Sequence, residues 1–166
     1  MEFVLKIVFV LLLAGIAVIV AHFVDSARKK VSHSSMSFRE TMDLCELPIV
    51  TFMNNGRKLN FLLDTGASKS VIHSGALEGL TYKSINKSGD VYGMDGKRKD
   101  ASFINMSIGY RGKDYNEEFQ SIDMSVPFSN LKADFGVNLH GILSSTFFQK
   151  YKYVLNFDEL VAYSMV

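Results

Sequence analysis

The chain has one cysteine, two prolines and no tryptophan among its 166 residues. A single cysteine, Cys45, cannot form a disulfide within the chain, so a disulfide-stapled fold is excluded. The formal net charge is only +1, and the chain as a whole therefore has no electrostatic attraction for nucleic acid. Hydrophobic residues make up 48% of the sequence and charged residues 21%, which is enough apolar material to build a folded core.

The residues that commonly bind metals or nucleic acid are not spaced as they are in such binding sites. The histidines are scattered, at His22, His33, His73 and His140. Their spacing is not that of metal ligands, and no histidine lies near Cys45 in sequence to activate it as a nucleophile. The basic runs at 28–30 and 97–99 are not interleaved with aromatic residues, as a nucleic-acid groove would be. We predict no metal, no cofactor and no nucleic-acid partner.

One long hydrophobic run stands near the start of the chain. Residues 7–24 carry no Asp, Glu, Lys or Arg, and at ~1.5 Å per residue they would reach ~27 Å, close to the ~30 Å thickness of a bilayer core. We therefore predict a single transmembrane helix, with residues 1–24 as the anchor. The alternative is a cleaved signal peptide, whose apolar region is typically shorter, at ~7–15 residues.

Charges that flank this run indicate its orientation. Glu2 and Lys6 precede it, whereas a basic cluster follows at 28–30. Basic residues concentrate on the cytoplasmic side of a membrane helix, so we expect a single-pass membrane protein with residues 31–166 facing the cytoplasm. Residues 25–44 are polar and rich in serine, without a sustained apolar period, and we predict a polar linker there.

The remaining residues, 45–166, have the pattern of a β-rich domain. An apolar stretch at 47–52 is followed by Asn54-Asn55-Gly56, which supplies the positive φ angles of a hairpin turn. The return strand is expected at 58–63. Glycines at 89, 93 and 96 mark a second, glycine-rich hairpin over residues 88–100.

Downstream residues continue the same pattern and add one helix. Residues 101–108 alternate in polarity, and residues 115–124 form the expected return strand. Thr146 and Gln149 fit a capping box at the start of a short helix. Residues 153–164 read as a closing pair of strands. We predict a mostly β domain, largely antiparallel, with one short helix near its C-terminus.

The most informative stretch is Phe61-Leu62-Leu63-Asp64-Thr65-Gly66-Ala67-Ser68. It places a carboxylate directly after an apolar strand, on a tight turn and partly withdrawn from water. Asp-Thr-Gly occurs once in the chain. Two carboxylates held close together share one proton, and such a pair provides an acid and a base at the same time. A single acid at this position lacks its partner.

Four segments occur in a fixed order: FLLDTGAS, VYGMDG, LHGIL and STFFQKY. Together they resemble the retropepsin-like aspartic proteases, of the membrane-anchored cellular or bacterial type, over residues 46–164. The resemblance implies a retropepsin-like acid-protease fold and an aspartic endopeptidase acting on peptides or proteins. Members of the family often have a second glycine where this chain has Ser144, which raises a question about the local backbone there.

The resemblance also implies roles for individual residues. Those implied for catalysis are Asp64, Thr65 and Gly66; those for support of the site are Ala67, Ser68 and Gly141; and those of the flap over the substrate are Tyr92, Gly93, Met94, Asp95 and Gly96. Thr65 would hydrogen-bond across the pair, and Ser68 would orient the carboxylate. Gly141 would let a facing segment pass without a side-chain clash.

Because the motif occurs once, the second aspartate would come from another copy of the chain, and we expect a symmetric homodimer. Two alternatives remain open from the sequence. One is a non-catalytic binding or dimerisation module on the same fold, since fold does not fix function. The other is an unrelated membrane-tethered β domain. Loss of cleavage on Asp64→Asn separates the enzyme from both.

Overall fold

The computed structural model describes residues 16, 18–19, 35–92 and 98–165. The chain divides into two units, residues 1–34 and the domain Ser35–Val166. In the first unit Ile16, Val18 and Ile19 are helical and exposed; the rest of the predicted transmembrane helix lies outside the described residues. Among the residues that are described, no helix is both long enough and apolar enough to span a membrane.

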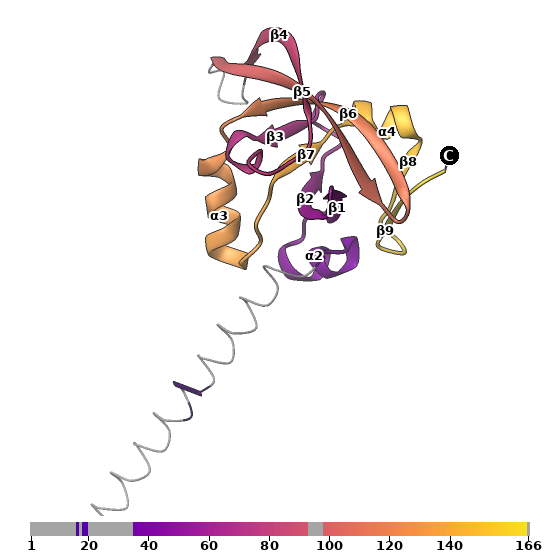
Figure 1. Cartoon of the computed structure of the whole chain (residues 1–166). Helices are drawn as coiled ribbons and strands as arrows, with labels where there is room; N and C mark the ends of the chain where they lie inside the picture. The colour runs from indigo at the N-terminus through magenta and orange to yellow at the C-terminus, as the bar shows by residue number, and fades with distance from the viewer. Residues whose placement is uncertain (1–15, 17, 20–34, 93–97, 166) are drawn as a thin grey trace, which may run out of the picture. The chain divides into compact units, whose positions relative to one another are not determined.

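Strands dominate the domain (Figure 1). They are β1 (Ile49–Asn54), β2 (Arg57–Leu63), β3 (Val71–His73), β4 (Lys83–Tyr92), β5 (Arg98–Tyr110), β6 (Lys113–Ile122), β7 (Gly141–Leu143), β8 (Tyr153–Asn156) and β9 (Val161–Ser164). The helices are α2 (Phe38–Cys45), α3 (Ser125–Phe135) and α4 (Ser145–Tyr151), with a 3₁₀ turn η1 at Ser74–Ala76. The prediction of a mostly β domain is confirmed.

Seven strands form one sheet in the order β1-β2-β7-β3-β6-β5-β4, and an additional pairing of β1 with β5 curls this sheet on itself. The hairpins β1/β2, β4/β5 and β5/β6 are antiparallel, as predicted. Asn55 and Gly56 have φ of 45° and 81° and close the first hairpin between Asn54 and Arg57. Two positive φ angles are what a two-residue turn between twisted strands requires.

One short strand, β7, decides how the sheet is threaded. It lies between β2 and β3, parallel to the first and antiparallel to the second. The loop that connects β2 to β3 must therefore pass the end of β7. That loop consists of residues 64–70, which begin with the Asp-Thr-Gly motif. The topology thus brings the motif next to the residues that follow β7.

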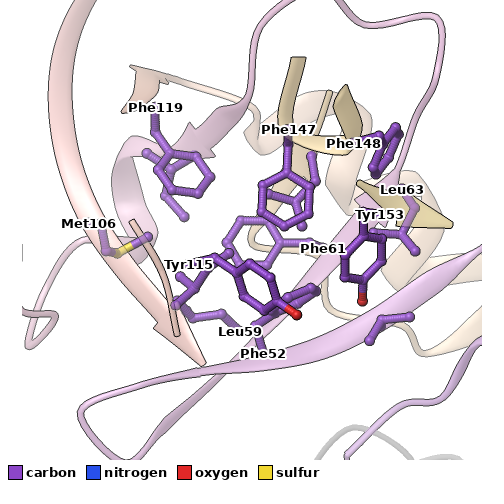
Figure 2. Close-up of a cluster of buried hydrophobic side chains, with 14 of the residues drawn as sticks. Phe52, Leu59, Phe61, Leu63, Met106, Tyr115, Phe119, Phe147, Phe148 and Tyr153 are labelled. Carbon is purple, nitrogen blue, oxygen red and sulfur yellow. The ribbon is translucent and has the colours of Figure 1, made fainter. Parts of the chain in front are cut away.

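Aromatic side chains fill the core of the domain (Figure 2). Phe52, Phe61 and Phe147 are fully buried. The Phe147 ring lies 6.2 Å from that of Phe52, edge to face, and Phe52 contacts Phe61 in the same way at 5.8 Å. Such pairs add to the free energy gained by burial. Because Phe61 is in β2 and Phe147 is in α4, the aromatic cluster holds α4 against the strand that leads to Asp64.

The helices differ from the sequence prediction. One helix was expected, and the described domain contains three α-helices. The expected helix is α4, but it begins at Ser145, with Ser144 as N-cap and no side-chain cap hydrogen bond, so the predicted capping box of Thr146 and Gln149 is wrong. Helix α3 was missed because its apolar period is weak: only Phe128 among its residues is buried.

The predicted linker at 25–44 is wrong for its last ten residues. The domain begins at Ser35, and α2 forms with a complete capping box between Ser37 and Glu40. Phe38 and Thr41 on α2 are buried. The Thr41 hydroxyl exchanges hydrogen bonds with the backbone of Ile49 at the start of β1. The sequence did contain signals for this helix, namely the Ser37 and Glu40 capping pair and the spacing of Phe38, Thr41 and Cys45 at one buried side chain per turn.

Candidate active site

Asp64 lies directly after β2, where the chain leaves the sheet. Its backbone N–H donates to the carbonyl of Leu143 at 2.9 Å, which extends the parallel pairing of β2 with β7 by one residue. The side chain is half-buried. Its Oδ1 accepts the N–H of Gly66 at 2.8 Å, and this bond fixes the carboxylate over the turn. A Cβ at position 66 would lie 3.2 Å from the same Oδ1, so glycine provides the space for this approach.

The rest of the motif loop is held by the segment after β7. The Ala67 carbonyl accepts two hydrogen bonds from Ser145, one from its N–H and one from its hydroxyl, each at 2.9 Å. The Thr146 hydroxyl donates to the Ser68 carbonyl at 3.3 Å. On the opposite side, the Ser70 carbonyl accepts the Gln120 N–H of β6 at 2.9 Å. The loop is therefore fastened through its backbone to two other segments.

Gly141 occupies a position where no side chain fits. An added Cβ would lie 2.3 Å from the Val71 carbonyl oxygen and 2.6 Å from the Phe61 ring. This close approach exists because β7 runs between β2 and β3. The predicted need for glycine agrees with this geometry, although the crowding comes from β3 and from Phe61 and not from the motif loop itself.

Ser144 has ordinary extended geometry, with φ −97° and ψ 172°. This conformation is open to any residue, so the serine does not distort the backbone at this position. The side chain is fully buried, and its Oγ lies 3.2 Å from Ser70 Oγ and 2.8 Å from Thr146 Oγ1. Serine in place of the family's second glycine therefore leaves the local backbone undistorted, and its hydroxyl is accommodated by polar neighbours.

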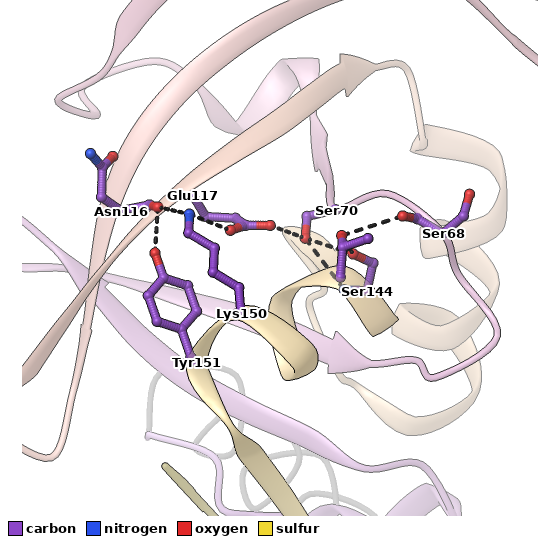
Figure 3. Close-up of polar contacts among 8 residues, drawn as sticks. Ser68, Ser70, Asn116, Glu117, Ser144, Lys150 and Tyr151 are labelled. Carbon is purple, nitrogen blue, oxygen red and sulfur yellow. Dashed lines mark hydrogen bonds and ion pairs between the residues drawn. The ribbon is translucent and has the colours of Figure 1, made fainter. Parts of the chain in front are cut away.

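The other predicted site residues have different surroundings. Thr65 and Gly66 are exposed, as is Ser68. The predicted hydrogen bond from the Ser68 hydroxyl to the Asp64 carboxylate is absent from this part of the described chain; only the Ser68 carbonyl joins the local network, and its hydroxyl points away (Figure 3). Ser68 therefore contacts α4 through its backbone and does not orient the acid.

The predicted flap is partly described. Strands β4 and β5 pair as far as Tyr92 and Arg98, so the hairpin has formed up to that point, and Figure 1 shows it projecting from one end of the domain. Tyr92 is the last residue of β4. Gly93, Met94, Asp95 and Gly96 lie outside the described residues.

Candidates for other chemistry were also located. Within the described ranges, no group of three or more His, Cys, Asp or Glu side chains could hold a metal ion. Cys45 is buried, and its Sγ lies 3.2 Å from the Thr41 carbonyl. Burial raises the pKa of this thiol, although a backbone hydrogen bond at Leu47 acts in the opposite direction. A thiol with a raised pKa is a poor nucleophile at neutral pH.

His140 precedes β7 and is expected to make the stability of the domain depend on pH. Its Nδ1 accepts the Asn60 N–H at 3.0 Å. Burial lowers the pKa of His140 below its usual 6.5, with further contributions from Arg57 and His73. A base whose pKa is lower in the folded state stabilises the fold above the unfolded pKa. This contribution is lost as pH falls toward the folded value.

We therefore expect acidification from about pH 7.5 to about pH 5 to lower the free energy of unfolding less in His140→Asn than in the wild type. The asparagine oxygen can accept the Asn60 N–H without titrating in this range. Urea unfolding of both proteins at the two pH values measures the difference. An equal loss of stability in the two proteins would contradict this assignment.

Three residues near the motif loop were not predicted from the sequence. Ser70, Glu117 and Lys150 form hydrogen bonds or an ion pair with one another behind the loop (Figure 3). A signal for Glu117 existed in the sequence, because Tyr115 and Phe119 stand two residues on either side of it; all three side chains are buried. Period-2 alternation places all three on one face of a strand.

Comparisons with known proteins agree with this geometry. A family model described as aspartyl protease matches residues 50–112, a range that contains the Asp-Thr-Gly motif and the β4/β5 hairpin. The retroviral protease-like domain of Ddi1 from Leishmania major has 12% sequence identity, with a TM-score of 0.54, over 72% of this chain and 88% of that one.

A second solved structure, EIAV protease complexed with the inhibitor HBY-793, has 22% identity over 65% of this chain and 90% of that one, with a TM-score of 0.49. The comparison with curated proteins gives no significant match. The family match and the likeness to the Leishmania domain confirm the resemblance to the retropepsin-like aspartic proteases, and the domain has the retropepsin-like fold.

Proposed function

We propose that this chain is a membrane-anchored aspartic endopeptidase, which hydrolyses peptide bonds between two copies of Asp64 in a homodimer. The observation that carries the proposal is the state of Asp64 itself. Its carboxylate is half-buried at the end of β2, on a loop fastened to two other segments, and the adjoining Thr65 and Gly66 are exposed. This arrangement presents a rigid acid at a surface that a second copy can reach.

The chemistry requires two such acids. A water molecule lies between the paired carboxylates, which share one proton. The ionised member takes a proton from the water as its oxygen attacks the carbonyl carbon of the peptide. The protonated member donates its hydrogen bond to the carbonyl oxygen. The tetrahedral intermediate then collapses: the C–N bond breaks, and the leaving nitrogen receives a proton from the pair.

Individual residues support these steps. The Gly66 N–H holds Asp64 Oδ1 in place, so that the other carboxylate oxygen remains available to water and to the partner acid. Thr65 is exposed beside it and would hydrogen-bond across the two-fold axis. The β4/β5 hairpin would close over a peptide or protein substrate and exclude water, as flexible elements over active sites do.

The anchor is proposed from sequence. The charge-free run at 7–24 would place the domain at a bilayer, and the basic residues at 28–30 favour the cytoplasmic side for residues 31–166. Confinement to a membrane raises the effective concentration of one chain around another, which favours pairing. Resistance of the membrane-bound chain to alkaline carbonate extraction tests the anchor, and protection of the domain from external protease tests its side.

Dosage of an inactive chain provides a direct test of the shared site. Wild-type chain is co-expressed with increasing amounts of Asp64→Asn chain, and peptide cleavage is measured per wild-type chain. Random pairing predicts that activity falls to about one half at equal amounts and to about one tenth at a ninefold excess. The reason is that a mixed dimer lacks one of the two acids.

The matched control is Asp134→Asn, which removes the same charge from an exposed position on α3. Co-expression of this chain should add to the total activity. Cleavage per wild-type chain that does not change with added Asp64→Asn would mean that each chain acts alone. No cleavage by any of these proteins would instead favour the non-catalytic binding or dimerisation module.

A further inference from the structure

A buried carboxylate lies behind the motif loop. Glu117 on β6 is only 5% exposed, and a buried charge is strongly unfavourable unless it is paired and hydrogen-bonded. Both of its oxygens have partners. Oε1 accepts the hydroxyl proton of Ser70 at 2.9 Å, and Oε2 lies 3.3 Å from the ammonium of Lys150 on α4.

Lys150 is held in place for this contact. Its ammonium also donates to the Asn116 carbonyl, which accepts the Tyr151 hydroxyl as well. Burial lowers the pKa of Lys150, but the Tyr151 hydroxyl and the Glu117 carboxylate outweigh this effect and raise it overall. This ammonium is the counter-charge of the Glu117 carboxylate, and a carboxylate can only accept hydrogen bonds.

A chain of hydroxyl groups continues from Glu117 to the motif loop (Figure 3). Ser70 Oγ receives the Ser144 N–H at 3.3 Å and lies 3.2 Å from Ser144 Oγ. Ser144 Oγ lies 2.8 Å from Thr146 Oγ1, and Thr146 donates its own proton to the Ser68 carbonyl. The network thus begins at Glu117 and ends at the loop that contains Asp64.

Counting protons gives the network a direction. Each hydroxyl has one proton to donate. The Ser70 proton is committed to Glu117 and the Thr146 proton to the Ser68 carbonyl, so the proton between Ser144 and Thr146 belongs to Ser144. Ser70 Oγ is then an acceptor for the Ser144 N–H. The Glu117 carboxylate accepts at one end of the network and the Ser68 carbonyl accepts at the other, which leaves one consistent arrangement of the protons.

We infer that Glu117 is a positioning residue for the catalytic loop, acting through Ser70 and Ser144 on the segments that hold Asp64. This inference rests on the proposed endopeptidase function. Ser70 is the last residue of the loop that starts with Asp64, and Ser144 adjoins Leu143, whose carbonyl accepts the Asp64 N–H. Fixing these two serines against each other fixes the loop relative to β7.

Glu117→Gln removes the charge and keeps the shape. If the amide oxygen faces Ser70, the amide NH₂ meets the Lys150 ammonium; in the flipped orientation, the NH₂ meets the Ser70 hydroxyl and reverses its role. The first orientation places two donors face to face, and the second turns the Ser70 proton away from position 117, so both disturb the network. We expect kcat for peptide cleavage by the full-length chain to fall about 10- to 100-fold, since small misplacements of reacting groups have effects of this size. KM should change less than about twofold, because Glu117 does not touch the substrate.

Glu118→Gln is the matched control. This residue is next to Glu117 on β6, its side chain is exposed, and it pairs with Lys87 at 3.1 Å; kcat should not change.

Ser70→Ala breaks the network at its second member and should reproduce the loss seen with Glu117→Gln, whereas Ser70→Thr keeps a hydroxyl and should restore most of kcat. In the double variant Glu117→Gln/Ser70→Ala the losses should not multiply, because both changes remove one pathway. Independent, multiplying losses, or a KM effect that equals the kcat effect, would overturn the inference.

Amide hydrogen exchange tests the same inference without an activity assay. In Glu117→Gln, exchange at the amides of Asp64, Ser144 and Ser145 should accelerate at least about tenfold. The Thr51 amide, which donates to the Met36 carbonyl far from the network, should be unaffected. Equal acceleration at all four amides would indicate a general loss of stability, and no acceleration would exclude positioning. Absence of cleavage by the wild type would count against the proposed function alone.

Discussion

Asp64→Asn is expected to lower kcat by at least about 10⁴-fold while leaving the fold intact. The loss is large because a symmetric site uses the same residue as acid and as base, and each role is worth roughly 10²–10⁴-fold. The asparagine oxygen can still accept the Gly66 N–H that Asp64 Oδ1 now accepts at 2.8 Å. The side chain is only half-buried, so the free energy of unfolding should change by less than about 0.5 kcal/mol.

The measurement combines steady-state cleavage of a mixed peptide library with urea unfolding of the same preparations. Asp134→Asn serves as the control, since it removes the same charge from an exposed position on α3 and should leave both readings unchanged. Retention of more than about one hundredth of the wild-type kcat by Asp64→Asn would place the catalytic acid elsewhere. A large loss of stability would instead assign Asp64 a structural role.

Gly141→Ala is expected to be strongly destabilising. The new Cβ would lie 2.3 Å from the Val71 carbonyl oxygen, a backbone atom that cannot turn aside, and 2.6 Å from the Phe61 ring. Relief of this clash requires β7 to move away from β2 and β3. We expect a loss of about 3 kcal/mol or more, a large part of the roughly 5–15 kcal/mol by which a typical domain is stable.

Gly56→Ala separates this clash from the general effect of replacing glycine. A Cβ at position 56 would have no atom within 4 Å, but its φ is +81°, so the cost there is conformational and only about 1–2 kcal/mol. Urea unfolding of the two variants gives the comparison. A loss in Gly141→Ala no greater than that in Gly56→Ala would show that β7 can shift without penalty, and that its packing between β2 and β3 is not rigid.

Local signals in the sequence were sufficient for much of the fold. The turn at Asn54-Asn55-Gly56, the glycine-rich hairpin and the alternation at 101–108 in β5 are short-range patterns, and the structure forms these hairpins. The motif at Asp64 was recognisable for the same reason, since the apolar strand and the Asp-Thr-Gly turn that follows it lie within eight consecutive residues. The helix at 125–135 was missed because it buries only Phe128 and so has a weak apolar period. The helix at 38–45 has a helical period in Phe38, Thr41 and Cys45, but it spans only eight residues and two of these three side chains are small.

The sequence by itself therefore predicted which residue is the acid and which hairpin is the flap, and it located the strand that leads to Asp64. Only the tertiary structure decided what holds the acid in place. The contacts of residues 64–70 with residues 143–146 and with β6 join positions that are more than 45 residues apart, and no local pattern encodes such pairs. Ser144 shows the difference most clearly. In the sequence it stood where the family often has a glycine; in the fold it is a buried residue in extended backbone, whose N–H donates to Ser70 Oγ because β7 passes between β2 and β3.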